Sequence, residues 1–195
     1  MRASVRGEQR RDQILVAAAK LASDGGVGAL SIGAVASNAG LAKSVVIYHF
    51  GGHDGLIEAL YAHVASKCLA PEFGALDGAD GDPREQLNRW LHAALGAAPA
   101  DVAERRLWLL LRQDGGCAAV RDLATDDSLR RQRMLEALLH EGHRQYCWQS
   151  PDPGTSATTV LAFLDGIWMT PAALLEGDDL RRIGRRAVLD LLVRR

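Results

Sequence analysis

The sequence is poor in the features that mark secreted, disulfide-linked or membrane-spanning proteins. Only three cysteines occur among 195 residues, at positions 68, 117 and 147, and none forms a CxxC pair. An odd number of widely spaced cysteines argues against a disulfide framework or a zinc ribbon and favours a reducing compartment. No stretch approaches the roughly 18 consecutive apolar residues of a membrane span, and no apolar run follows the basic N-terminus as in a signal peptide. We therefore expect a cytoplasmic protein with no membrane attachment.

The signatures of common enzyme classes are also missing. The sequence contains no GxSxG elbow, phosphate-binding loop, HExxH pair or dinucleotide-binding fingerprint. The composition, 48% hydrophobic and 24% charged, is that of a globular protein rather than a disordered one. We therefore expect a folded protein that is not an enzyme and carries no cofactor or metal.

Apolar residues recur at helical spacing in nearly every segment, and no stretch alternates with period two for long enough to indicate a strand. The sequence therefore predicts an all-α fold of about nine helices. Residues 71–83, rich in Gly, Pro and Asp, are predicted to form the clearest loop. The expected helices are 8–23, 32–38, 43–49, one from about 53 to this loop, 84–97, 101–113, 127–147, 155–175 and 179–193, with a short helical piece at 117–124.

The net charge of -1 hides an asymmetry along the chain. Residues 1–55 contain six Lys and Arg against four Asp and Glu, so the excess of acidic residues lies in the remainder. A phosphate backbone requires a locally positive surface. The N-terminal segment is therefore the better candidate for contact with nucleic acid.

Residues 30–50, LSIGAVASNAGLAKSVVIYHF, predict two short helices joined by a tight turn. Ser31 is placed to cap the first helix through its hydroxyl. Gly40 can adopt the positive φ that the turn needs. Val46 and Phe50 would then anchor the second helix in the core.

This arrangement leaves six residues of the second helix facing outward or partly outward. In helix-turn-helix motifs this element enters the major groove of DNA, where such side chains reach bases and phosphates. Spacing alone also fits a helical corner that binds nothing. The six residues are Lys43, Ser44, Val45, Ile47, Tyr48 and His49.

Residues 8–64 resemble the N-terminal domain of the bacterial TetR family of transcriptional regulators. The resemblance rests on the runs LSIGAVASNAGL, AKSVVIYHF and HDGLIEALYAHV, and on the spacing of the Tyr-His-Phe triplet from Ala36 and Gly40. It implies a DNA-binding domain at 1–52 and an effector-binding and dimerisation domain at 53–195. A homodimer would bind operator double-stranded DNA as a repressor and be released by a small molecule.

The resemblance adds Ser31 and His53 to the expected DNA contacts, but three positions depart from the family's pattern. Ala42 stands where a capping Ser or Thr is usual, Ile47 where an aromatic residue is frequent, and His53 where a phosphate-contacting lysine is usual. These departures keep open a second interpretation, a helical ligand-binding dimer with a degenerate helix-turn-helix.

Residues 155–193 predict two helices with strong apolar stripes, too hydrophobic to remain uncovered in a monomer. A two-fold four-helix bundle would bury them. The run LAFLDGIWM resembles the penultimate helix of TetR members close to the betaine-operon repressor. The expected interface residues are Phe163, Ile167, Leu180, Ile183, Ala187 and Leu191.

Aromatic residues from several helices, interspersed with polar groups, predict an effector pocket in the C-terminal domain. The alternative for each of them is an ordinary place in the core. The expected lining is Trp90, Trp108, Leu111, Arg112, Leu138, Asp165 and Trp168.

A metal-responsive regulator is the remaining alternative. His140, His143 and Cys147 occur at i, i+3 and i+7, which would place them on one face of a helix. Imidazole and thiolate are ligands for zinc or copper.

Overall fold

A computed structural model describes residues 2–77, 81–96, 99–150, 152–170 and 177–193, and within these ranges it contains helices and no strand. The all-α prediction is therefore confirmed. None of the helices described is both long and apolar enough to cross a membrane. The elements are α1 (Arg2–Gly25), a 3-10 turn (Val27–Ala29), α2 (Ile32–Asn38), α3 (Lys43–Phe50), α4 (His53–Leu76), α5 (Pro83–Ala94), α6 (Pro99–Asp114), α7 (Ala118–Arg144), α8 (Pro153–Met169) and α9 (Gly177–Val193).

The chain forms two compact units. Unit 1 contains residues 1–66 and 107–124, and unit 2 contains residues 67–106 and 125–195. Helices α4, α6 and α7 each contribute residues to both units.

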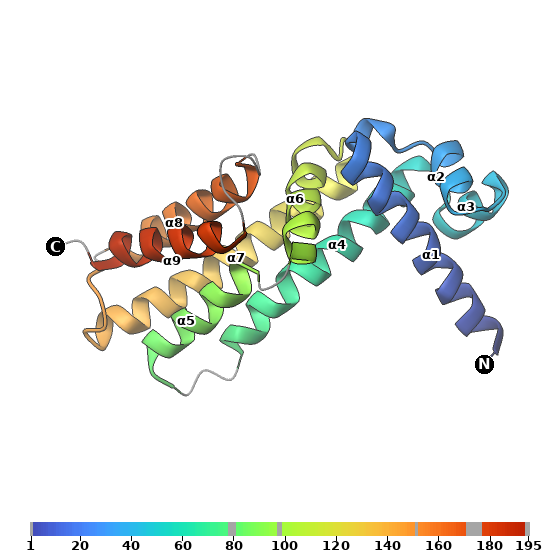
Figure 1. Ribbon diagram of the computed structural model, residues 1–195. Coiled ribbons are helices and arrows are strands. Elements are labelled where there is room, and N and C mark those ends of the chain that lie inside the picture. Colours follow the sequence, from blue (N-terminus) through green and yellow to red (C-terminus); the bar gives the residue numbers. More distant parts are fainter. Residues whose placement is uncertain (1, 78–80, 97–98, 151, 171–176, 194–195) are drawn as a thin grey trace. The chain divides into compact units, whose positions relative to one another are not determined.

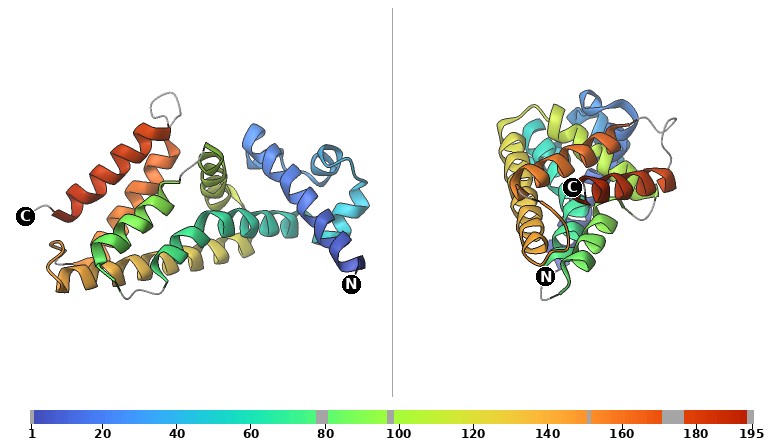
Figure 2. Two further views of the ribbon diagram at one scale, coloured as in Figure 1. Left: turned by 60° about the horizontal axis from the view of Figure 1, so that its bottom comes forward. Right: turned by 90° about the vertical axis from the view of Figure 1, so that its left-hand side faces the viewer.

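Unit 1 is built around α1, α2 and α3, which lie side by side in Figures 1 and 2, with α2 packing on both of the others. Its core comes from the apolar stripe of each helix. Trp108, fully buried, donates its indole N–H to the Tyr61 hydroxyl at 3.3 Å. Buried side chains that share this core include Ile14, Ala18, Val35, Val46, Leu56 and Leu60.

Unit 2 includes α8 and α9, which run side by side in Figures 1 and 2. Trp168 is buried, and its indole N–H donates to the carbonyl of Ala94 at 3.2 Å. Arg106 donates to the carbonyls of Trp168 and Thr170 at 3.1 and 3.0 Å. It thus supplies donors and positive charge at the C-terminus of α8, where helical carbonyls lack partners.

A buried ionic network crosses the interior of unit 2. Glu72 has no exposed surface, and its carboxylate accepts from Arg105 Nη1 at 2.5 Å and from Arg131 Nε at 3.0 Å. Arg131 also donates to Asp165 Oδ1 at 3.2 Å, and Arg105 to the carbonyl of Cys68 at 2.9 Å. Burial opposes the charge of Arg131, but Glu72 and Asp165 outweigh it and raise the pKa of the guanidinium. Each buried charge in the network is therefore compensated.

The predicted loop at 71–83 is wrong in its first half, because α4 continues through Pro71 to Leu76. Proline inside a helix costs about 3 kcal/mol. Here the extra turns bury Glu72 in the ionic network and place the Phe73 ring 3.9 Å from the Arg130 guanidinium. These contacts offset the loss of one amide donor, and they could not be deduced from the local sequence.

Two other predicted boundaries are also wrong. The piece at 117–124 and the helix at 127–147 are one helix, α7, which ends at Arg144. No glycine or proline separates the two predicted pieces, so the helix continues. Beyond it the chain turns at Tyr146, whose φ is +57°. Helix α1 begins at Arg2, earlier than the predicted start at residue 8.

Replacing Glu72 with Gln should lower the free energy of unfolding by about 3–5 kcal/mol, because Arg105 and Arg131 would lose the carboxylate they share. Urea unfolding measures this change. Glu58→Gln, on the exposed face of α4, is the matched control and should stay within about 0.5 kcal/mol of the wild type. Equal stability of the two variants would contradict the network's role.

Replacing Gly55 with Ala should destabilise the corner between α3 and α4 by about 1–3 kcal/mol or more. A Cβ at this position would lie 2.1 Å from the backbone oxygen of Phe50. Gly74→Ala on the same helix meets no atom within 4 Å and should stabilise by about 0.5–1 kcal/mol. Thermal unfolding measures both changes. A shift of the two melting temperatures in the same direction would contradict the steric argument.

Candidate nucleic-acid interface

The turn between α2 and α3 has the predicted geometry. Ser31 Oγ accepts from the Ala34 amide at 3.1 Å and caps α2, as expected. Gly40 has a φ of +66°, and the following Leu41 amide donates to the Ala36 carbonyl at 2.8 Å. This bond closes the end of α2 and lets the chain reverse into α3.

Helix α3 exposes the face that the sequence predicts. Val46 and Phe50 are buried, with 0% and 8% of their surfaces exposed. Tyr48 is 84% exposed and Ile47 49% exposed. The other residues of the predicted face are exposed (Lys43 and Ser44) or half-buried (Val45 and His49).

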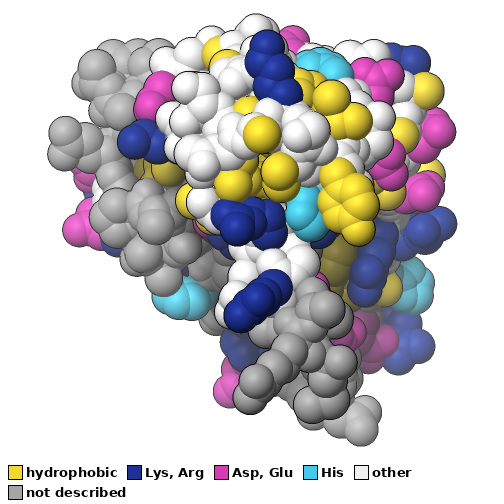
Figure 3. Space-filling view, turned by 90° about the vertical axis from the view of Figure 1, so that its right-hand side faces the viewer, with side chains coloured by type: hydrophobic (Ala, Val, Ile, Leu, Met, Phe, Trp, Pro, Cys, Tyr) yellow, Lys and Arg dark blue, Asp and Glu magenta, His cyan; other side chains and the backbone are white. Residues whose placement is uncertain are grey.

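Figure 3 views the face that carries α3. Basic, histidine and hydrophobic side chains lie together in the middle of this face, and acidic side chains lie mainly toward its edges. A surface of this composition suits duplex DNA, which presents phosphates and base edges together.

Gly33 on α2 positions Lys43, a role that the local sequence did not predict. A Cβ on Gly33 would lie 3.0 Å from Lys43 Cε and 3.3 Å from its Nζ. The lysine stem therefore lies along α2 where the missing side chain leaves room. Nothing in the local sequence pattern indicates this contact, because it joins two helices.

Arg11, on α1, fixes the end of α3. Its guanidinium lies 4.5 Å from the Phe50 ring centroid and donates to the His49 carbonyl at 3.0 Å. Gln13, also on α1, donates to the carbonyl of Ala39 at 2.9 Å. Helix α1 thus holds both the α2–α3 turn and the C-terminus of α3.

Ala42, as expected, provides no side-chain hydrogen bond to the N-terminus of α3. His53, at the start of α4, places Nε2 2.7 Å from the Leu30 carbonyl and Nδ1 3.4 Å from the Asp54 carboxylate. These bonds link α4 to the segment preceding α2, and the imidazole remains half exposed at the surface.

The predicted effector-pocket residues fall in different units. Trp108, Leu111 and Arg112 belong to unit 1, and the other four belong to unit 2. The five apolar residues are buried, Asp165 binds Arg131, and the Arg112 guanidinium lies 5.6 Å from the Trp108 ring. Two cavities in unit 2, of about 490 and 230 Å³, are lined by other residues.

The predicted metal-binding face does not form. Helix α7 ends before Cys147, whose Sγ lies 3.9 Å from Asp82 Oδ1, and His143 Nδ1 accepts from the Ser150 amide at 3.2 Å. No group of three His, Cys, Asp or Glu side chains suited to a metal ion occurs in the part of the chain that the structure describes. Burial raises the pKa of Cys68 to about 11, which keeps this thiol protonated.

The predicted dimer-interface residues divide into two groups. Ile167 and Leu180 are buried within the chain itself, at 6% and 1% exposure. Ile183 and Leu191 remain 38% and 41% exposed, and Phe163 and Ala187 are half-buried.

Comparison with known proteins agrees with this geometry. Residues 14–60 match the family described as bacterial regulatory proteins, tetR family. The HTH-type transcriptional regulator BetI of Stenotrophomonas maltophilia is 24% identical over 162 residues, covering 82% of this chain and 80% of the relative. BetI 1 of Chromohalobacter salexigens is 24% identical over 181 residues, covering 89% and 84%.

Solved structures share the fold over nearly the whole chain. A TetR-family regulator from Rhodococcus sp. aligns with a TM-score of 0.81 and 24% identity, covering 94% of this chain and 98% of that one. A transcriptional regulator from Saccharomonospora viridis, solved in complex with choline, aligns with a TM-score of 0.82 and 21% identity, covering 96% and 100%. The family match at α1–α4, the relatives and the shared helical fold agree: residues 14–60 match the DNA-binding domain of the tetR family, and the chain as a whole is similar to transcriptional regulators of that family.

Proposed function

We propose that the protein is a homodimeric repressor that binds operator DNA through residues 1–52 and is released by a small molecule bound within residues 53–195. The observation that carries this proposal is the exposed face of α3, where a largely solvated tyrosine and a lysine lie beside apolar side chains. Such a regulator acts in the cytoplasm, where its operator lies.

The side chains on α3 match the chemistry of a major groove. Lys43 and Ser44, in the first turn, can reach guanine acceptors or phosphates. Val45 and Ile47 offer apolar contact to thymine methyl groups, and Tyr48 can donate to a phosphate. His49 on α3, together with Ser31 and His53 outside this helix, completes the proposed contact set. An exposed face with this mixture is better explained by recognition than by stability, because Val46 and Phe50 already anchor the helix.

The exposed apolar residues of α9 support a homodimer. Ile183, Ala187 and Leu191 occur at i, i+4 and i+8, so they form one stripe along the helix. On the adjacent α8, Phe163 is half-buried and Met169 is 40% exposed. A two-fold axis would bring two copies of this helix pair together and remove the stripe from water. Ile167 and Leu180 would then support the interface from the core.

Release by a small molecule follows from the two-copy arrangement. Two α3 helices must be spaced by about one turn of DNA, roughly 34–36 Å. An effector that binds a differently spaced dimer more tightly shifts the population away from DNA. Helix α4 carries residues of both units and is the proposed lever. The relatives named BetI and the choline complex of the Saccharomonospora neighbour support a small-molecule effector.

Lys43→Gln and Tyr48→Ala should each weaken binding to the intergenic DNA upstream of the protein's own gene by about 1–3 kcal/mol, or roughly 5- to 150-fold. Lys43→Gln should also reduce the slope of log affinity against log salt concentration by about 1, the change expected for the loss of one phosphate contact. Fluorescence anisotropy at several salt concentrations measures both effects. Lys20→Gln is the control, because Lys20 is exposed on α1 and this substitution removes the same charge as Lys43→Gln. Sequence-independent binding by the wild type would favour a degenerate helix-turn-helix instead.

Leu191→Glu should convert the dimer to monomer, because it places a carboxylate in an apolar interface. Sedimentation equilibrium measures the oligomeric state. Leu129→Glu is the matched control, since Leu129 is 45% exposed on α7 and lies outside the proposed interface. A dimer that survives in the Leu191 variant with unchanged affinity would place the interface elsewhere.

A further inference from the structure

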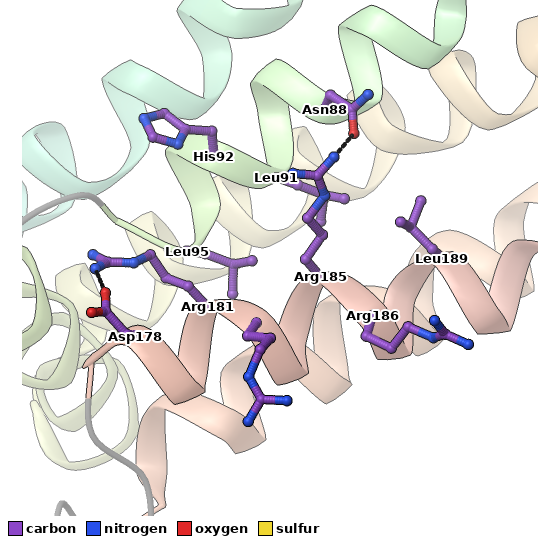
Figure 4. Close-up of a pocket in the computed structure, with 10 residues that line it drawn as sticks. Asn88, Leu91, His92, Leu95, Asp178, Arg181, Arg185, Arg186 and Leu189 are labelled. Atoms are coloured by element: carbon purple, nitrogen blue, oxygen red, sulfur yellow. Dashed lines mark hydrogen bonds and ion pairs between the residues drawn. The ribbon is translucent and has the colours of Figure 1, made fainter.

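A groove of about 490 Å³ lies between α5 and α9, and none of its lining residues belongs to the proposed DNA contacts or to the proposed dimer stripe. Figure 4 shows Arg185 reaching from α9 to Asn88 on α5, which also carries His92, while Arg181 extends toward Asp178 on its own helix. Asn88 and His92 are spaced by four residues, as are Arg181 and Arg185, so each pair presents two polar groups on one side of its helix. The polar lining of the groove thus comprises Asn88 and His92 on α5 and four arginines and Asp178 on α9.

The charge of Arg185 is not compensated by a carboxylate. Its Nη2 donates to the neutral Oδ1 of Asn88 at 3.1 Å, and no ion pair to it occurs among the residues that the structure describes. Arg181, by contrast, pairs with Asp178 and donates to the Gly96 carbonyl at 3.5 Å. The other two arginines of α9 pair with their neighbours, Arg182 with Asp179 and Arg186 with Asp190, at 2.8 and 3.0 Å.

The floor of the groove is apolar. Leu91 and Leu95 are 1% and 4% exposed, and Leu189 is half-buried beside them. Gly184 allows α9 to lie close to α5, since a Cβ there would stand 2.7 Å from Leu95 Cδ2. A cationic group thus borders a hydrophobic surface.

We infer that the groove between α5 and α9 binds an amphipathic organic anion, whose acidic group pairs with Arg185 and whose apolar body lies on Leu91, Leu95 and Leu189. A guanidinium pairs with a carboxylate through two parallel hydrogen bonds. Among the described residues no Trp, Tyr or Phe lines the groove, so these residues do not form the aromatic cage that holds quaternary ammonium ions. The ligand class is set by this charge and this floor, and the inference depends neither on DNA binding nor on the dimer.

Two probes with the same tail and opposite head groups test the site. Decanoate should bind the full-length protein in isothermal titration calorimetry, and decyltrimethylammonium should bind at least about tenfold more weakly. Arg185→Gln should weaken decanoate binding by about tenfold or more, the loss expected for one charged hydrogen-bonded contact. Leu189→Ala should weaken it several-fold by removing apolar contact.

Arg133→Gln is the matched control, because Arg133 is exposed on α7 and does not line the groove. This variant should bind decanoate within about twofold of the wild type, and circular dichroism should show all variants folded. The inference is overturned if decanoate does not bind, if the two probes bind equally, or if Arg185→Gln has no more effect than the control. It is also overturned if Arg185→Gln changes the oligomeric state, which would assign the groove to a contact between copies of the chain.

Discussion

The burial of Val46 and Phe50 is the constraint on which the DNA-binding half depends. These two side chains, four residues apart, fix the rotation of α3 about its axis, and the remaining positions must then face outward. Arg11 strengthens the anchor by lying over the Phe50 ring and bonding the His49 carbonyl. The absence of a capping side chain at Ala42 is tolerable because tertiary packing, rather than local propensity, holds this short helix.

Unit 2 is organised by a different kind of interaction. The carboxylate of Glu72 is shared by Arg105 and Arg131, and Arg131 in turn binds Asp165. Such a network is sensitive to the loss of one partner, because the remaining charges cannot be hydrated in the core. It also brings a guanidinium over an aromatic face, since Arg105 lies 5.7 Å from the Trp168 ring centroid. This aromatic face is therefore already occupied by a cation of the chain itself.

Helix α9 joins three roles in one amphipathic segment. Leu180, Gly184 and Val188 are buried against the rest of unit 2. Ile183, Ala187 and Leu191 form the stripe proposed for the dimer, and Arg181 and Arg185 border the groove toward α5. The 3.6-residue period of the helix places these sets on different sides of its axis. A ligand in the groove would therefore contact the same helix that we propose to carry the dimer interface.

Local patterns in the sequence determined the helical fold, the cap at Ser31, the turn at Gly40 and the outward face of α3. Each depends on residues close together in the chain, where helical periodicity and glycine conformation decide the outcome. Tertiary structure alone decided the continuation of α4 through Pro71, the end of α7 before Cys147, the use of Gly33 and Gly55, and the Glu72 network. These features depend on contacts between segments distant in sequence, and the energies of those contacts override the local preferences of proline, glycine and charged side chains.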